Sequence, residues 1–282
     1  MYKIGMSSCG FEPNEANFKS LSESKIECIE ISMSYEKYKD INYKEVKTLS
    51  ERYGVGLWSY HLPFWPFETL EISAFDKSIR DNTVSYFSEL IKMASDIGID
   101  KFIVHPSGEP IPDSEREDRM KYSMQSLDSL AEIAHGCGSV IAVEDLPRTC
   151  LGNTSDDVLR LISANDKLRV CFDTNHLLSE DNIDFMKKVG DKIITVHISD
   201  YDFVNERHWL PGEGRLDWKR MLATLKEIGY SGVWMYEIGL RCPKTLVRDR
   251  DLTFADFYSN AQTIFEGKDP DPIGRPSVAL WI

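Results

Sequence analysis

Several features that would assign this sequence to a class at once are missing from it. It has no CxxC pair, and its six cysteines are scattered, which argues against a cysteine-bound zinc site or a disulfide framework. No apolar run approaches the roughly 18 residues of a membrane span, and the N-terminal segment has too short an apolar stretch for a secretory signal. These absences predict a cytoplasmic protein with reduced thiols and no membrane partner.

Basic residues are also in short supply. The chain has 33 Lys and Arg against 46 Asp and Glu, a formal net charge of −13. This balance argues against broad attraction to phosphate backbones or anionic lipid, so nucleic acid is not the favoured partner. No Gly/Ser/Pro-rich linker divides the chain, and the GxGxxG fingerprint of dinucleotide-binding sheets is missing after the first expected strand.

What the sequence does contain is a regular alternation of short β-branched runs and longer amphipathic stretches. Strands are expected at 2–8, 26–32, 54–61, 101–105, 139–145, 167–173, 192–199 and 232–238, with helices at 13–23, 43–53, 74–97, 114–136, 155–164, 180–190, 217–228 and 250–266. Eight repeats are the number that closes a barrel, so we predict a single (β/α)8 TIM barrel over residues 1–266. Residues 267–282 are expected to form a short C-terminal extension that packs on the barrel or on a second subunit of a homodimer.

Six consecutive expected strands deliver a His, Asp or Glu at their carboxyl ends. These residues are His61, His105, Glu144, Asp173 (with His176 just after it), His197 and Glu237. In a barrel such ends converge on the face where active sites lie. Each residue alone could be structural, but clustered carboxylates repel one another unless a cation neutralises them. Carboxylates combined with imidazoles predict a site for divalent metal, Mn²⁺, Co²⁺, Zn²⁺ or Mg²⁺.

A second polar cluster follows the seventh expected strand, in the segment Glu206-Arg207-His208-Trp209. Arg207 and His208 are expected over the barrel mouth, where they would suit an oxyanion or a phosphate. Several aromatic residues are expected near the mouth too, where they would shield a reaction intermediate and stack on sugar CH faces: Trp58, Tyr60, Phe64, Trp65, Phe67 and Trp209. Core packing is the competing interpretation for Trp58.

In this order, the segments HLPF, VHP, VED, FDTNH, VHISD, ERHWLPGEGRLDW and YEI resemble the xylose-isomerase-like TIM-barrel superfamily. That group includes sugar and sugar-phosphate isomerases and epimerases, enzymes of inositol catabolism, and endonuclease IV. The resemblance runs from about residue 61 to residue 237. The first two strands and the C-terminal tail contribute nothing diagnostic to it.

Resemblance to the ketose 3-epimerases implies one metal held by Glu144, Asp173, His197 and Glu237, with Glu144 and Glu237 as the catalytic acid–base pair. The substrate would then be contacted by the other residues of the mouth: His61, His105, His176, Arg207, His208, Trp209 and Phe64. Resemblance to endonuclease IV implies two or three zinc ions instead, with His61, His105, His176, Glu206 and His208 as additional ligands. Glu206 departs from that family, which has Asp at this position.

The sequence therefore predicts a metal-dependent isomerase or epimerase of a small sugar or sugar phosphate, working through a metal-bound enediolate. The alternative is a multi-zinc phosphodiesterase acting on abasic DNA. The net charge and the lack of basic, aromatic-interleaved loops argue against it. A metal-stabilised binding protein without turnover is a third reading, and it requires both glutamates to be purely structural.

Overall fold

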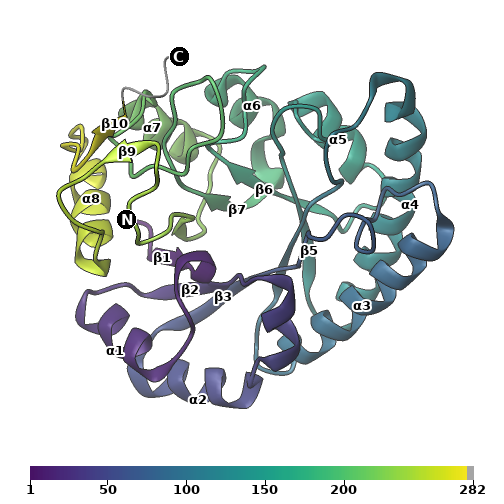
Figure 1. Cartoon of the computed structure of the whole chain (residues 1–282), viewed down its shortest axis with the longest axis horizontal. Coiled ribbons are helices and arrows are strands. Elements are labelled where there is room, and N and C mark those ends of the chain that lie inside the picture. The colour runs from purple at the N-terminus through teal and green to yellow at the C-terminus, as the bar shows by residue number, and fades with distance from the viewer. Residues whose placement is uncertain (278–282) are drawn as a thin grey trace.

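Eight parallel strands form a barrel in the computed structural model, which describes residues 1–277 (Figure 1). The strands are β1 (Ile4–Ser7), β2 (Cys28–Ile31), β3 (Gly56–His61), β4 (Lys101–Val104), β5 (Val140–Glu144), β6 (Arg169–Asp173), β7 (Ile193–His197) and β8 (Trp234–Tyr236). They follow chain order from β1 to β7, and β8 pairs with β1. The Ile198 N–H donates to the Met235 carbonyl (2.7 Å), which links β7 to β8. The predicted (β/α)8 barrel is confirmed.

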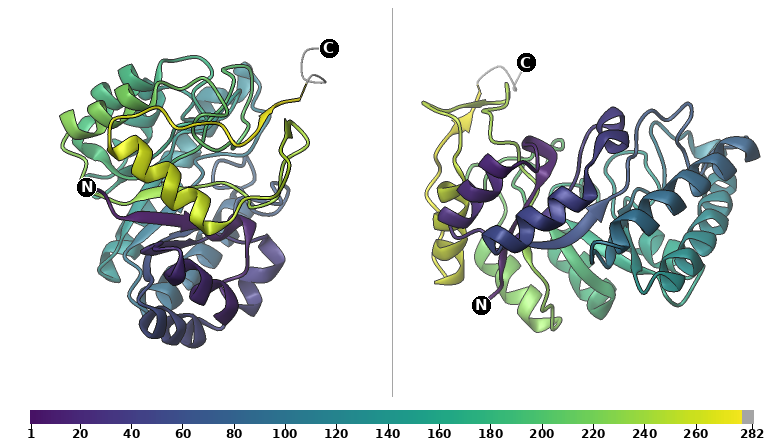
Figure 2. Two further views of the ribbon diagram at one scale, coloured as in Figure 1. Left: turned by 90° about the vertical axis from the view of Figure 1, so that its left-hand side faces the viewer. Right: turned by 90° about the horizontal axis from the view of Figure 1, so that it is seen from below.

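Helices connect successive strands and cover the outside of the barrel (Figures 1 and 2). They are α1 (Glu15–Glu23), α2 (Tyr43–Tyr53), α3 (Lys77–Ser95), α4 (Asp113–Gly136), α5 (Ser155–Ile162), α6 (Asn182–Val189), α7 (Trp218–Glu227) and α8 (Phe254–Phe265). All eight fall on predicted ranges. Local chemistry sets the ends: the Asn14, Asp76 and Asp181 side chains accept backbone N–H groups at the starts of α1, α3 and α6. Three short 3-10 helices, η1 (Ser8–Gly10), η2 (Tyr35–Asp40) and η3 (Gly190–Lys192), were not predicted.

Side chains along each strand alternate between the helix-facing core and the barrel interior. The helix-facing residues, such as Phe102 and Val143, join one large apolar core. The lower half of the interior, toward the amino ends of the strands, holds two small apolar clusters: Cys28, Val233 and Met235 on one side, and Ile103, Ala142 and Cys171 on the other. The barrel is therefore plugged at its floor, and only its carboxyl-end layer is free to carry chemistry.

A β-bulge decides the position of Trp58. The register between β2 and β3 pairs Ile29 with Leu57 and then Glu30 with Ser59, so Trp58 is the extra residue. Its ring packs against the floor cluster, and its indole N–H donates to the Thr195 hydroxyl (3.1 Å). The expectation that Trp58 lies near the mouth is wrong, and the core-packing interpretation is correct.

The chain after α8 returns to the barrel rather than leaving it. A two-stranded antiparallel ribbon joins β9 (Leu246–Val247), in the loop after β8, to β10 (Arg275–Pro276) (Figure 2). A buried ion pair between Arg248 and Glu213 (2.5 Å) ties the loop after β8 to the loop after β7. The predicted apolar end of the tail, 278–282, lies outside the described residues, and dimerisation stays a prediction. No helix within residues 1–277 is long and apolar enough to cross a membrane.

Candidate metal centre and active site

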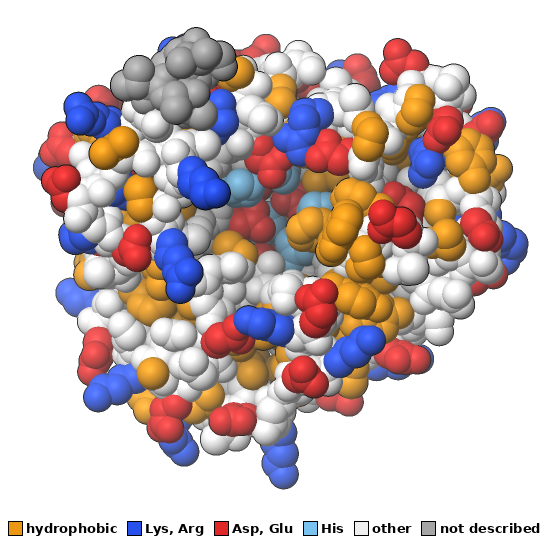
Figure 3. Space-filling model, viewed as in Figure 1, with side chains coloured by type: hydrophobic (Ala, Val, Ile, Leu, Met, Phe, Trp, Pro, Cys, Tyr) orange, Lys and Arg blue, Asp and Glu red, His pale blue; other side chains and the backbone are white. Residues whose placement is uncertain are grey.

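The six strand ends that the sequence singles out meet in one hollow at the carboxyl-end face of the barrel. Figure 3 shows acidic and histidine side chains on the floor of this hollow, at the centre of the face. Four of the residues end their strands: His61, Glu144, Asp173 and His197; His105 and Glu237 each follow their strand by one residue. Parallel strands deliver their carboxyl ends to the same face, so the barrel itself brings these side chains together.

In a central group of four donor atoms, three carboxylate oxygens lie around one ring nitrogen of His197. The His197 Nδ1 lies 2.8 Å from Glu144 Oε1 and 3.3 Å from Glu237 Oε2. It lies 3.9 Å from Asp173 Oδ2. One donor atom from each of the four residues lies within 4.8 Å of the others. One imidazole nitrogen with three carboxylate oxygens is a donor set that suits Mn²⁺, Co²⁺, Zn²⁺ or Mg²⁺.

One carboxylate oxygen of this donor set, and two beside it, lack hydrogen-bond partners in the described part of the chain. Asp173 Oδ2, Glu30 Oε1 and Asp145 Oδ2 are buried and have no hydrogen-bond partner within residues 1–277. Burial, followed by the negative charge of Glu237, raises the pKa of Asp173 well above its usual value. Buried carboxylates without donors are costly, and a divalent cation would supply the missing charge.

His61 and His105 form a second donor group with the other oxygen of Glu144. The Nε2 atom of each ring lies 3.1 Å from Glu144 Oε2. Burial lowers the pKa of His61, but the hydrogen bond to Glu144 and the nearby carboxylates outweigh it and raise the pKa to about 9. Burial lowers the pKa of His105. The Glu144 carboxylate can therefore serve two neighbouring donor groups, one through each oxygen.

A third donor group consists of His176, Glu206 and His208. Glu206 Oε1 lies 3.2 Å from His208 Nε2 and 4.0 Å from His176 Nε2. Its other oxygen accepts from Arg148 Nη1 at 2.7 Å. Burial opposes ionisation of Glu206, but the hydrogen bond and charge of the histidines lower its pKa to about 2. The longer Glu side chain thus still brings an ionised oxygen to both histidines, although Arg148 competes for that carboxylate.

The residues predicted to contact substrate divide into two sets. His61, Phe64, His105, His176 and His208 line a cavity of about 130 Å³ above the ligands. The Phe64 ring stacks on His105 (centroids 4.3 Å apart) and is 44% exposed, so it forms part of the cavity wall and rim.

Arg207 and Trp209 are absent from this lining. The Arg207 guanidinium pairs with Asp202 (2.9 Å), and its backbone N–H donates to Asn175 (2.8 Å). The Trp209 indole is fully buried and donates to the Thr245 hydroxyl (2.9 Å). Both residues brace the loop after β7 in this structure.

Sequence reasoning missed Glu30, which lies on β2 and is fully buried in the barrel interior. Its Oε2 lies 3.1 Å from His197 Nε2 and accepts from the Ser59 hydroxyl at 2.7 Å. If His197 donates its Nε2–H to Glu30, its Nδ1 lone pair points at the central group. Such a carboxylate–histidine pair commonly orients a metal ligand. The available signal was a single acid inside the short apolar strand Cys28–Ile31.

Asp145, next to Glu144, was also passed over. Its Oδ1 accepts the Asp173 backbone N–H (2.7 Å), and its carbonyl oxygen lies 2.7 Å from His176 Nδ1. A proton on His176 Nδ1 would leave Nε2 free to face the cavity. Asp145 therefore fixes the backbone of one ligand and the ring of another residue of the site.

Comparison with known proteins gives a family match over most of the chain. The family model described as xylose isomerase-like TIM barrel matches residues 18–254. A D-psicose 3-epimerase of Ruminiclostridium cellulolyticum is 26% identical over 74% of this chain and 72% of its own length. A fructoselysine 3-epimerase of Shigella flexneri is 23% identical over 84% of this chain and 90% of its own.

Solved structures show the same fold. The crystal structure of a D-tagatose 3-epimerase-like protein superposes with a TM-score of 0.79 at 24% identity, covering 94% of this chain and 96% of the other. At this identity the likeness concerns the barrel and leaves the substrate open.

Proposed function

Because the chain belongs to the xylose isomerase-like TIM-barrel family, we propose that it is a divalent-metal-dependent isomerase or epimerase of a small sugar or sugar phosphate. Its relatives include sugar epimerases. The observation that carries the proposal is the placement of Glu144 and Glu237, which reach the same ring nitrogen of His197 from two different strand ends. Two carboxylates beside one cation position provide the acid–base pair that the reaction needs.

The surroundings of both glutamates keep them ionised. Burial disfavours their ionised forms, but the charge and hydrogen bonds of neighbouring histidines outweigh it. The pKa of Glu144 is held well below its usual value, and the pKa of Glu237 is lowered too. One glutamate would remove the proton from the carbon beside the carbonyl. The other, after taking up a proton from solvent, would deliver it to the opposite face of that carbon, giving an epimer, or to the adjacent carbon, giving an isomer.

A cation held by Glu144, Asp173, His197 and Glu237 would supply Lewis-acid stabilisation of the negative charge that develops on the sugar oxygen. The chain's other residues would orient the substrate. His61, His105 and His176 line the cavity and would hydrogen-bond sugar hydroxyls. Phe64, stacked on His105, would cover the reacting carbons and restrict the access of water.

The test replaces each glutamate with glutamine. Glu144→Gln and Glu237→Gln keep an oxygen ligand atom but cannot accept the proton, so turnover should fall at least about 100-fold. Deuterium incorporation from D2O, followed by NMR over a panel of ketoses, keto-inositols and their phosphates, measures this directly. His135→Ala, at an exposed position on α4, is the control and should leave turnover unchanged. Full activity in both glutamine variants would contradict the assignment.

The three donor groups around the mouth support a second candidate, a multi-zinc phosphodiesterase acting on abasic DNA. They are His61–His105–Glu144, Glu144–Asp173–His197–Glu237 and His176–Glu206–His208; a fourth group within residues 1–277, Glu144–Cys171–His197, shares two residues with the central one. Elemental analysis of gently purified protein separates the two candidates. About one metal per chain favours the epimerase, whereas two or three zinc ions per chain would favour phosphodiester cleavage as the activity.

A further inference from the structure

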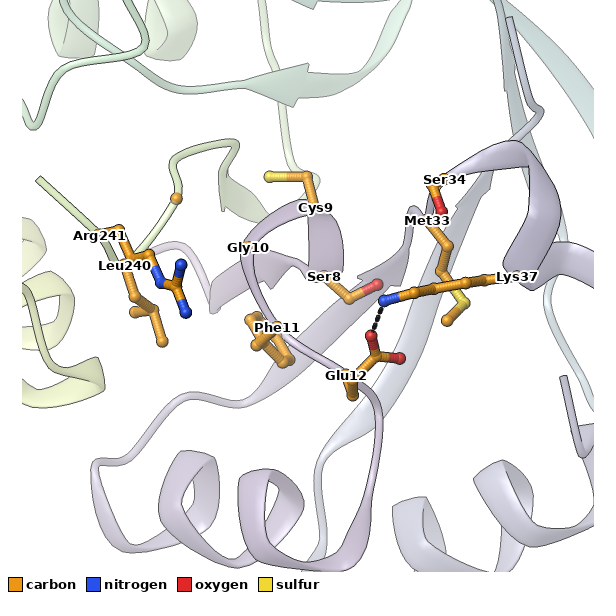
Figure 4. Close-up of a pocket in the computed structure, with 11 residues that line it drawn as sticks. Ser8, Cys9, Gly10, Phe11, Glu12, Met33, Ser34, Lys37, Leu240 and Arg241 are labelled. Carbon is orange, nitrogen blue, oxygen red and sulfur yellow. Dashed lines mark hydrogen bonds and ion pairs between the residues drawn. The ribbon is translucent and has the colours of Figure 1, made fainter. Parts of the chain in front are cut away.

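A second and larger cavity lies beside the metal-ligand cluster, on the β1 and β8 side of the barrel mouth. Its volume is about 480 Å³, and it is formed by segments that follow β1, β2 and β8 (Figure 4). The first and last of these segments touch, since a Cβ on Gly10 would lie 2.7 Å from the Cα of Gly239. Gly239 is two residues from the proposed ligand Glu237, so the cavity adjoins the reaction site.

The thiol of Cys9 links the two regions electrostatically. Cys9 belongs to the lining of this cavity. Desolvation by the surrounding protein, followed by the negative charge of Glu237, raises the pKa of Cys9 to about 12. The thiol is therefore neutral, and it lies within electrostatic reach of a carboxylate of the central group.

Charged side chains enter the cavity from two sides. Figure 4 shows Arg241 on one side and Lys37 on the other, with Phe11 and Glu12 between them. The Lys37 ammonium is paired with the Glu12 carboxylate. Within residues 1–277 the Arg241 guanidinium makes no hydrogen bond or ion pair. One positive charge in the cavity is thus left without a partner, in a chain whose net charge is −13.

The other two arginines near the mouth are already engaged. Arg148 pairs with Glu109 and Glu206, the latter at 2.7 Å. Arg207 pairs with Asp202 at 2.9 Å. Binding an anion through either residue would first require an existing ion pair to break. Arg241 alone among these three can take an anion without that cost.

We propose that this cavity binds an anionic group, a phosphate ester or a carboxylate, at the end of the substrate remote from the reacting carbons, with Arg241 as its anchor. This inference rests on the proposed function and narrows its substrate class. The planar guanidinium matches the paired oxygens of both groups and can bind them through two hydrogen bonds. The apolar side chains of Phe11, Met33 and Leu240 would contact the intervening carbon chain.

The central carboxylates make this placement reasonable. Glu144, Asp173 and Glu237 would repel a substrate anion that lay among them. A substrate oriented with its neutral hydroxyls over the cluster and its charge toward Arg241 avoids that repulsion. The cation of Arg241 would also offset, at short range, the repulsion of an anion by the acidic chain as a whole.

The test compares a free ketose with its charged counterparts in wild-type protein and in Arg241→Ala. D-fructose, D-fructose 6-phosphate and D-fructuronate differ only at the remote carbon, which carries a neutral hydroxyl, a phosphate ester and a carboxylate, respectively. Comparing them separates the effect of charge from the preference for one anionic group. We expect kcat/KM of the preferred charged substrate to fall about 10- to 100-fold in Arg241→Ala, the range for a charge-assisted hydrogen bond. The value for D-fructose should change less than about twofold. Lys244→Ala, in the same loop and exposed, removes the same charge and is the matched control.

An equal loss for D-fructose, or an equal loss in Lys244→Ala, would overturn the inference while leaving the proposed activity standing. Failure of every ketose to exchange deuterium would instead refute the proposed function. In that case a direct measurement of anion binding tests whether Arg241 anchors an anion. Inorganic phosphate is titrated into Mg²⁺-loaded protein and followed by ³¹P NMR. Binding about 10-fold weaker in Arg241→Ala than in Lys244→Ala supports the site. Equal binding in the two variants refutes it.

Discussion

The lower and upper layers of the barrel interior differ in chemistry although they are two residues apart on the same strands. On β5, Ala142 belongs to the floor and Glu144 to the mouth; on β6 the corresponding pair is Cys171 and Asp173. The floor is apolar and closely packed. The mouth layer is equally buried, yet it concentrates carboxylates and imidazoles, several with unpaired oxygens.

The floor layer therefore stabilises the folded barrel, whereas the mouth layer destabilises it in the absence of a cation. Apolar burial in the floor stabilises the fold in proportion to the area removed from water. Buried carboxylates without donors work against folding until a cation neutralises them. Truncating a floor residue should therefore lower the stability of the fold and leave metal binding intact. Replacing a carboxylate of the mouth should abolish metal binding and leave the stability of the metal-free chain unchanged or higher.

The largest effect is expected for Asp173→Asn in the mouth layer. We expect loss of bound metal and at least a 1000-fold loss of turnover, on the order of 4 kcal/mol of transition-state stabilisation. Burial and the charge of Glu237 raise the pKa of Asp173, so its ionised form opposes folding above the usual carboxyl pKa. The metal-free variant should accordingly melt at the same temperature as wild type or higher. Elemental analysis and thermal melts with chelator measure both effects.

Asp166→Asn, the same change at an exposed position before β6, is the control for Asp173→Asn and should alter neither quantity. The contrast between the layers would be reversed if Asp173→Asn retained its metal as purified and, after chelation, melted several degrees below wild type.

In the floor, Ile103→Ala should lower the free energy of unfolding by about 2–5 kcal/mol, because Ile103 is fully buried and its removal leaves a cavity. Urea unfolding in the presence of chelator measures this, and Ile103→Val, which removes one methylene, should cost only about 1 kcal/mol. Metal content per folded chain should stay at the wild-type value. A loss of metal as large as that in Asp173→Asn would show that the two layers are not separable.

Glu30→Gln tests the connection between the layers. Because Glu30 holds the Nε2 side of His197, we expect metal affinity to fall about 10- to 100-fold while the chain remains folded. Competition with a chromogenic chelator gives the affinity. Glu23→Gln, at an exposed position on α1, serves as the control. Unchanged affinity in Glu30→Gln would mean that barrel packing alone orients the His197 ring.

The smallest effect is expected outside the barrel, at the start of α8. Asp256 accepts the Thr253 backbone N–H (2.7 Å) and pairs with Arg250 (2.7 Å). Partial burial opposes ionisation, but these contacts lower the pKa of Asp256 to about 2. Its contribution is therefore complete above the unfolded carboxyl pKa of about 3.9 and is lost as the pH falls toward 2.

At pH 7, Asp256→Asn should cost about 0.5–1 kcal/mol, a small value because solvent screens the pair. The difference from wild type should vanish near pH 2 in denaturant titrations, and turnover should be unaffected. A difference that grows as the pH falls would contradict this account of the cap.

Much of the architecture could be read from the sequence because its cues are local. The spacing of apolar residues placed all eight barrel strands and all eight helices. The caps that the structure shows at Asn14 and Asp76 are also local, since each bonds a backbone N–H two or three residues along the chain. The ends of the strands also marked the residues that converge at the mouth. Glu30 escaped notice because one acid in a short apolar strand looks the same whether it faces a ligand or a helix.

The sequence by itself determined the eightfold repeat and the residue types at the strand ends, since both depend on periodicity along the chain. Only the tertiary structure decided which atoms meet. The bulge that turned Trp58 into the floor arises from pairing between two strands. The engagement of Arg148 and Arg207, and the unpaired state of Arg241 within residues 1–277, depend on loops far apart in the chain. Partners across space are set by chain closure and packing, and no local pattern encodes them.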